Sequence, residues 1–179
     1  PNQQDLLFAH GRGDVRVYHL ETGKAETLVD SFSAPAFDVS PDGKWIVYAR
    51  TDNNFNSDIW IAPIDQTSEA INISRHPDDE YGPKWSPDGS KIASGDRVGN
   101  LRVHSLSTAG EVLQIETFLE AHDAEILSLD YGGHDGNLLA SAARDRLIHV
   151  FDQTKNYDTV CTLDDHAAAV TSVRFAPHG

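Results

Sequence analysis

The stretch Phe37-Asp38-Val39-Ser40-Pro41-Asp42-Gly43-Lys44-Trp45-Ile46-Val47-Tyr48 places a short strand, a tight turn and a second strand in a row. In the Ser40–Gly43 turn, proline presets φ, aspartate hydrogen-bonds locally and glycine accepts a positive φ. The residues after the turn alternate and are rich in aromatic and β-branched types, as in a half-buried strand. The stretch therefore predicts a β-hairpin.

The same turn recurs along the chain. Ser86–Gly89 repeats it residue for residue, and looser copies stand at His134–Gly136 and Ala176–Gly179. The spacing is about 45 residues, which is the period of a β-propeller blade, and it is kept when counting continues from the last residue to the first. No helical period is visible. We therefore expect an all-β fold, a β-propeller with four blades per chain.

Because the repeat spacing continues from the last residue to the first, the two ends of the chain are expected to belong to one blade. Its inner strand is expected at Val170–Phe175, and its other strands at 5–9, 15–18 and 26–29. Two chains could exchange these strands and close a ring of about eight blades, with about 45° between neighbours and no unpaired strand edge. We expect this eight-bladed homodimer, with a four-bladed monomer as the alternative.

Composition restricts the partners. The net charge of −14 opposes binding to the phosphate backbone of nucleic acid. No apolar run approaches the ~18–20 residues of a membrane span, so we expect a soluble protein that inserts into no membrane and whose compartment the composition does not define. The one cysteine, Cys161, excludes an intramolecular disulfide and is expected to be a buried, inert thiol.

Residues 1–89 resemble the repeats of TolB- and Tricorn-type propellers. The resemblance rests on the Phe37–Tyr48 stretch, on Ser57–Ile61, on Ser74–Pro77 and on Pro83–Gly89. These motifs are specific to the family and to no one member. They imply propeller blades and no catalytic activity.

Residues 90–179 are similar to WD40 repeats, in particular those of mitogen-activated-protein-kinase-binding scaffold proteins. The similarity rests on Gly95–His104, Glu120–Leu127 and Leu138–Val150. Such a change of family near Ser86–Ile92 suggests a chimera of two half-propellers joined through the shared turn. A natural divergent propeller fragment is the alternative.

The WD40 resemblance also implies a buried hydrogen-bond network. His122, Ser141 and Asp145 match its first three positions, whereas Phe151 stands at the tryptophan position and lacks an indole N–H. We therefore expect an incomplete network, with His122 as a structural anchor of its loop in preference to a ligand or a base.

Motifs of catalysis and metal binding are missing from the sequence. It contains no Gly-x-Ser-x-Gly nucleophile elbow and no close His/Cys pairs of the zinc-binding type. We therefore expect no enzyme, no cofactor and no metal site, and a non-enzymatic scaffold, designed or recombined, whose main property is folding and self-assembly.

A peptide-binding module is the alternative function. Acidic and histidine side chains gather in loops that a propeller places on one face, around the mouth of its channel, where their charges add. That acidic face could hold a basic peptide, and its expected members are Asp78, Asp79, Glu80, Glu120, His122, Asp123, Asp164, Asp165 and His166.

Overall fold

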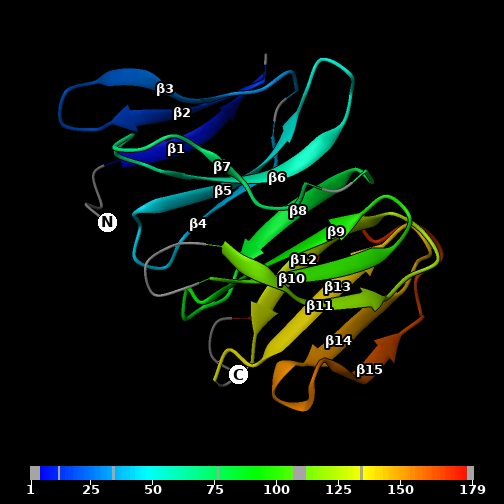
Figure 1. Cartoon of the computed structure of the whole chain (residues 1–179). Helices are drawn as coiled ribbons and strands as arrows, with labels where there is room; N and C mark the ends of the chain where they lie inside the picture. The colour runs from blue at the N-terminus through cyan, green and yellow to red at the C-terminus, as the bar shows by residue number, and fades with distance from the viewer. Residues whose placement is uncertain are drawn as a thin grey trace.

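The computed structural model describes residues 5–11, 13–33, 35–75, 77–106, 112–133 and 135–176. In this part of the chain the strands form four antiparallel sheets, one of three strands and three of four. The sheets follow one another along an arc, and each is one blade of a propeller (Figure 1). The all-β propeller expected from the repeat is confirmed. Within the same residues, no helix is long and apolar enough to cross a membrane.

The blades run in sequence order. The first blade contains β1 (Asp5–His10), β2 (Asp14–His19) and β3 (Lys24–Asp30), and the second contains β4 (Phe37–Val39), β5 (Trp45–Thr51), β6 (Ser57–Pro63) and β7 (Ile71–Asn72). The third blade contains β8 (Glu80–Trp85), β9 (Lys91–Asp96), β10 (Asn100–Leu106) and β11 (Val112–Glu120). The fourth blade contains β12 (Ile126–Gly132), β13 (Leu138–Ala143), β14 (Ile148–Asp152) and β15 (Asp158–Leu163). A 3-10 turn, Gln153–Lys155, joins β14 to β15.

The repeated turns have the chemistry that the sequence predicts. Ser40 and Ser86 each donate a side-chain hydrogen bond to the aspartate two residues later, at 2.7 and 2.6 Å. Gly43 and Gly89 end these turns with φ of 68° and 73°, a conformation that glycine adopts without strain. The looser copies contain residues outside the described part of the chain, His134 and 177–179.

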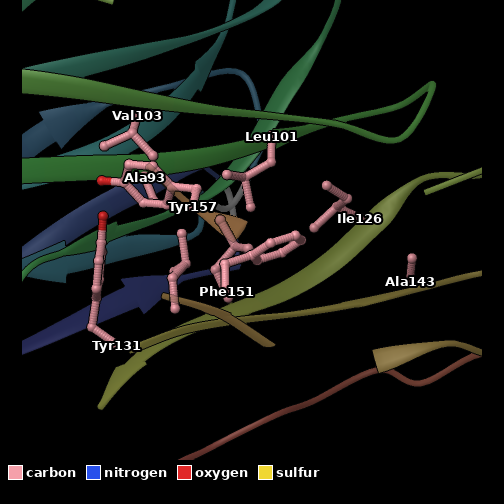
Figure 2. Packing of buried hydrophobic residues seen from close by; sticks show 10 residues of the cluster. Ala93, Leu101, Val103, Ile126, Tyr131, Ala143, Phe151 and Tyr157 are labelled. Carbon is pink, nitrogen blue, oxygen red and sulfur yellow. The ribbon is translucent and has the colours of Figure 1, made fainter. Parts of the chain in front are cut away.

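The core lies between neighbouring blades. β8 packs against β4, β5 and β6 on one side and against β12 on the other. Figure 2 shows the cluster between the third and fourth blades, where Leu101 and Val103 of β10 face Ile126, Tyr131 and Phe151 of the fourth blade. Radial packing of this kind buries both faces of an inner blade, whereas a terminal blade keeps one face open.

Within a single chain one expectation about the C-terminal part is not met, and another is wrong. Residues 170–175 pair with no strand in the described chain, because their expected partner β1 lies at the other end of the arc. Cys161 is exposed and not buried, since it lies on β15, the outermost strand of the fourth blade.

Candidate functional site

The loops before β8 and β12, two of those expected to form the acidic face, both contact the β9–β10 hairpin, and arginines pair with part of the charge of these loops. Arg97, in the β9–β10 hairpin, lies 3.5 Å from Asp79 in the loop before β8. Arg144, in the β13–β14 hairpin, pairs with Glu125 in the loop before β12. Both arginines come from hairpins at the same ends of the blades. The face is therefore less acidic than the loops alone would make it.

Glu80 does not belong to this exposed face. It is fully buried and accepts hydrogen bonds from Ser94 and from Arg102, whose side chain is 2% exposed. Arg102 also bonds to Asp96 at 2.8 Å and lies 3.9 Å from Asp78. Burial raises the pKa of Glu80, although Ser74, Arg102 and Ser94 oppose it. Glu80, Arg102 and Asp96 thus form a buried network inside the third blade.

The structure brings together the three residues matched to the WD40 network. His122 Nδ1 lies 2.9 Å from Asp145 Oδ2, and its Nε2 lies 2.7 Å from Ser141 Oγ. Burial lowers the pKa of His122, although the hydrogen bond with Asp145 and the charge of Asp145 act to raise it. Burial alone would raise the pKa of Asp145, but hydrogen bonds from Leu147 N–H and from His122 hold it below its usual value. Phe151 instead packs in the apolar cluster.

The remaining members of the expected face are solvent-exposed: Glu120, Asp123, Asp164, Asp165 and His166. Asp164–His166 follow the last strand of the fourth blade, and Asp123 donates its backbone N–H to Asp145 at 3.2 Å. Among the described residues, no group of three or more His, Cys, Asp or Glu side chains could hold a metal ion.

A contact that sequence analysis missed joins the inner strand of the second blade to that of the third. In the second blade, Asp38 of β4 accepts the backbone N–H of Trp85 at 3.0 Å and pairs with Lys84 at 3.1 Å. Asp38 thereby anchors β8, the inner strand of the third blade. We call this arrangement the inner-strand anchor.

The C-terminal segment repeats the inner-strand anchor. Asp130 of β12 accepts the backbone N–H of Phe175 at 2.7 Å, and Arg174 lies 3.5 Å from the same carboxylate. Phe175 also lies so close to Gly132 that a Cβ there would come within 2.1 Å of its ring. Residues 170–175 therefore occupy the place of an inner strand of a blade that follows the fourth. The spacing of one repeat between each aspartate and its anchored residue could have revealed the contact.

The opposite end of the arc lacks such an inner strand. Leu6 of β1 is 57% exposed, whereas Ile46, Ile92 and Leu139, on the second strands of the other three blades, are fully buried. β1 pairs with β2 along one edge, and no strand in the described chain pairs with its other edge. One end of the chain thus carries an inner strand without a blade, and the other carries a blade without an inner strand.

The comparisons with known proteins agree with this architecture. Residues 113–152 match the family model "WD domain, G-beta repeat". The chain is 52% identical over 93 residues to WD repeat-containing protein 62 of Mus musculus and to mitogen-activated protein kinase-binding protein 1 of Homo sapiens, which is 51% of this chain and 6% of each relative. It is 36% identical over 96 residues to nuclear distribution protein PAC1 of Gibberella zeae, 53% of this chain and 20% of that protein.

A solved structure shows the same fold over nearly the whole chain. A chain in the crystal structure of the mitotic checkpoint complex superposes with a TM-score of 0.77 at 20% identity. The match covers 97% of this chain and 52% of that chain. The protein is thus a β-propeller in its fold, similar to WD repeat proteins over about half its length, and it spans a small part of those curated relatives.

Proposed function

We propose that this chain is a non-enzymatic protein-interaction scaffold that closes its propeller with a second copy of itself. The observation that carries the proposal is the inner-strand anchor at Asp130, which holds Arg174 and Phe175 as Asp38 holds Lys84 and Trp85. Residues 170–175 thus take the position of an inner strand, although no further strands of that blade follow them in the described chain. The partner's β1 would supply the missing edge.

Two such exchanges make a closed ring. Each chain gives its residues 170–175 to the partner's β1–β3 blade, which becomes four-stranded, and the ring contains about eight blades related by a two-fold axis. Closure covers the exposed Leu6 and removes the unpaired edge of β1. Free strand edges favour pairing with another chain, so closure also protects the protein from open-ended association.

We further propose that the chain combines two kinds of blade. Residues 1–89 would be a TolB- or Tricorn-like half-propeller and residues 90–179 a WD40-like one, designed or recombined through the Ser86–Gly89 turn. The support is chemical: the second and third blades share the Ser-Pro-Asp-Gly turn, whereas the fourth has the His122 network and a looser turn.

Sedimentation equilibrium tests the assembly. A dimer has about twice the 19.6 kDa mass of the chain. Leu6→Lys should give a particle with the mass of one chain, because burying a charged lysine under the added strand is unfavourable. The matched control is Val160→Lys on β15, where the side chain is 55% exposed and lies outside the proposed interface. A folded wild-type particle with the mass of one chain would refute the proposal.

The acidic face is a second candidate, for basic peptides. The observation that favours it is the exposure of Asp123, Asp164 and Asp165, which lie in the loops before and after the strands of the fourth blade. Binding should weaken steeply with salt because the contacts are between surface charges. Calorimetric titration with a lysine-rich peptide at low ionic strength, repeated with Asp164→Asn/Asp165→Asn, decides it, and absence of heat in the wild type counts against it.

A further inference from the structure

Two exposed phenylalanines meet where the first blade joins the second. Phe32 lies in the loop between β3 and β4, and Phe55 lies in the β5–β6 hairpin. Their ring centroids are 5.2 Å apart, and the rings meet edge to face at an angle of 84°. The two residues are 58% and 68% exposed. Contiguous exposed apolar side chains, unlike single ones, are typical of interaction sites. We call these two side chains the aromatic pair.

The third and fourth blades have an ion pair where the second blade has the aromatic pair. In all three blades a backbone hydrogen bond joins the loop before the inner strand to the hairpin between the second and third strands. Beside this bond, the third blade pairs Asp79 with Arg97. The fourth blade pairs Glu125 with Arg144. The architecture of a blade therefore does not require an apolar contact at this position.

Phe55 stands where glycine stands in two of the other three blades. The β1–β2, β5–β6, β9–β10 and β13–β14 hairpins each close with a backbone N–H from a residue at positive φ. In chain order these residues are Gly13, Phe55, Gly99 and Arg146. A positive φ, here 66°, is unfavourable for a large side chain and easy for glycine. The turn alone therefore does not explain the phenylalanine.

Hydrogen bonds hold both loops in place and leave the rings exposed. Ser31 Oγ accepts the backbone N–H of Thr51 at 3.3 Å, which ties the β3–β4 loop to the hairpin. Within the hairpin, one carboxylate oxygen of Asp52 accepts the backbone N–H groups of Asn54 at 2.8 Å and Asn56 at 3.0 Å. A surface with a fixed backbone loses little conformational entropy on binding. The aromatic pair is thus preorganised for a contact.

The charge beside the aromatic pair is negative. Asp30 and Asp52, both exposed, stand two and three residues before the two phenylalanines. Residues 30–36 and 51–57 include no lysine or arginine, and the guanidinium of the neighbouring Arg50 lies over the ring of Trp60. Carboxylates repel an anionic membrane surface and attract the basic side chains of a protein partner. The charge therefore favours a basic protein segment over a membrane.

We propose that the aromatic pair docks a short segment of a partner protein that carries one large apolar side chain next to a lysine or arginine. The apolar side chain covers both rings, and its cationic neighbour approaches Asp30 or Asp52. Aromatic side chains that become buried at the centre of an interface contribute much of its binding energy. The inference rests on the proposed scaffold role and gives it a class of partner. It needs no second copy, so sedimentation can refute the ring while this site still binds.

A blocked heptapeptide tests the site. It has phenylalanine at its centre, lysine on each side of it, and glycine and serine elsewhere. In NMR titrations at low ionic strength, the backbone N–H signals of Phe32 and Phe55 should move, and that of Val98 in the β9–β10 hairpin should not. Alanine in place of the central phenylalanine should weaken binding about tenfold. Glutamate in place of both lysines should weaken it about fivefold.

A glycine at position 55 separates binding from folding. Phe55→Gly removes one ring and suits the positive φ, so it should weaken binding of the heptapeptide about tenfold without lowering the melting temperature. The matched control is Val98→Ser, because Val98 is 59% exposed and lies in the corresponding hairpin of the third blade. This control should leave the affinity unchanged.

Four results would overturn the inference. The first is a wild-type Phe55 signal that does not move in a large excess of the heptapeptide. The second is equal affinity for the alanine-centred peptide, and movement of the Asp164 and Asp165 signals would then assign the peptide to the acidic face. The third is a lower melting temperature of Phe55→Gly, which would make the aromatic pair a structural contact. The fourth is co-sedimentation of the wild type, but not of Phe55→Gly, with phosphatidylcholine vesicles, which would make a lipid surface the occupant.

Discussion

One carboxylate, that of Asp145, joins three parts of the fourth blade. It pairs with the His122 ring and accepts the backbone N–H groups of Asp123 at 3.2 Å and Leu147 at 3.0 Å. Asp145→Ala should lower the free energy of unfolding by about 1–3 kcal/mol, because the buried His122 would lose a partner. Urea denaturation checks this, with exposed Asp164→Ala as the control. An unchanged midpoint would contradict a stabilising role for the network.

His104 should make the protein sensitive to acid. It is fully buried, its ring nitrogens have no hydrogen-bond partner among the residues that the structure describes, and burial, aided by the charge of Arg102, lowers its pKa from 6.5 to about 4. The folded state therefore resists protonation, and its stability is full above pH 6.5 and falls as the pH drops from there toward 4. The loss from this one group is about 3 kcal/mol.

His104→Leu should remove that part of the acid sensitivity. Leucine has a similar volume and needs no hydrogen bond, so the variant should also be at least as stable as the wild type at neutral pH. Thermal melts at pH 7 and pH 5 measure the difference, with the exposed loop histidine variant His166→Leu as control. An equal drop in melting temperature in His104→Leu and the wild type would show that His104 does not cause it.

Residues of the fourth blade were easier to predict than the buried charged residues of the third blade. His122, Ser141 and Asp145 follow the spacing of a known repeat. Glu80 was expected at the surface because it stands in an acidic run, Asp78–Glu80. Its burial depends on Arg102, a residue of a different strand, and a linear sequence does not show which partner will neutralise a charge.

Strands and turns could be predicted where their determinants are local. The Ser40–Gly43 turn contains its own hydrogen bonds, so β4, the turn and β5 follow from twelve consecutive residues. Residues 170–175 have strand-like composition but no strand pairing here. Strand pairing requires a neighbour, and the required edge is at the other end of the arc.

The C-terminal segment should contribute strongly to stability even without strand pairing. Val170 is 8% exposed and packs with Ala142 and Ile148, and Val173 lies against the same cluster. Deleting residues 170–179 removes this cover, and each apolar side chain lost contributes about 1.5–3 kcal/mol. The free energy of unfolding of a whole domain is only about 5–15 kcal/mol. We expect the truncated chain to be insoluble or unfolded.

A shorter deletion provides the control for that prediction. Removing residues 176–179 leaves the Phe175 N–H in its bond to Asp130 and should preserve folding. Solubility and the thermal unfolding transition compare the two truncations. If the longer truncation keeps the parent melting temperature, the segment does not hold the fourth blade together.

For the whole molecule, the ring predicts a definite strand register. The β1–β2 and β9–β10 hairpins have the same turn, with Gly13 and Gly99 at φ of 101° and 100°. Aligning these glycines puts Leu6 in the position of Ile92. In the third blade, Trp85 pairs with Ile92. Because Phe175 occupies the place of Trp85 in the inner-strand anchor, Phe175 should pair with Leu6 of the second copy.

A disulfide at this pair tests both the register and the closure of the ring. The Trp85 N–H points to Asp38 and not to β9, so the Trp85–Ile92 pair is of the non-hydrogen-bonded kind. Such pairs have Cα atoms about 4.5 Å apart, which is short enough for a disulfide. The variant Leu6→Cys/Phe175→Cys is made with Cys161→Ser, because Cys161 is exposed and could form unwanted crosslinks.

Oxidation of this variant should give one covalent species of two chains on a non-reducing gel. The two disulfides between the chains use all four introduced cysteines, so none is left to bind a third chain. Leu6→Cys alone, and the off-register pair Ala9→Cys/Phe175→Cys, should remain largely monomeric on the gel. A ladder of higher masses would mean that the chains join head to tail without closing, as heterologous contacts do. A crosslink within one chain would instead establish the four-bladed monomer, because only closure of the arc on itself can bring Leu6 to the Phe175 of its own chain.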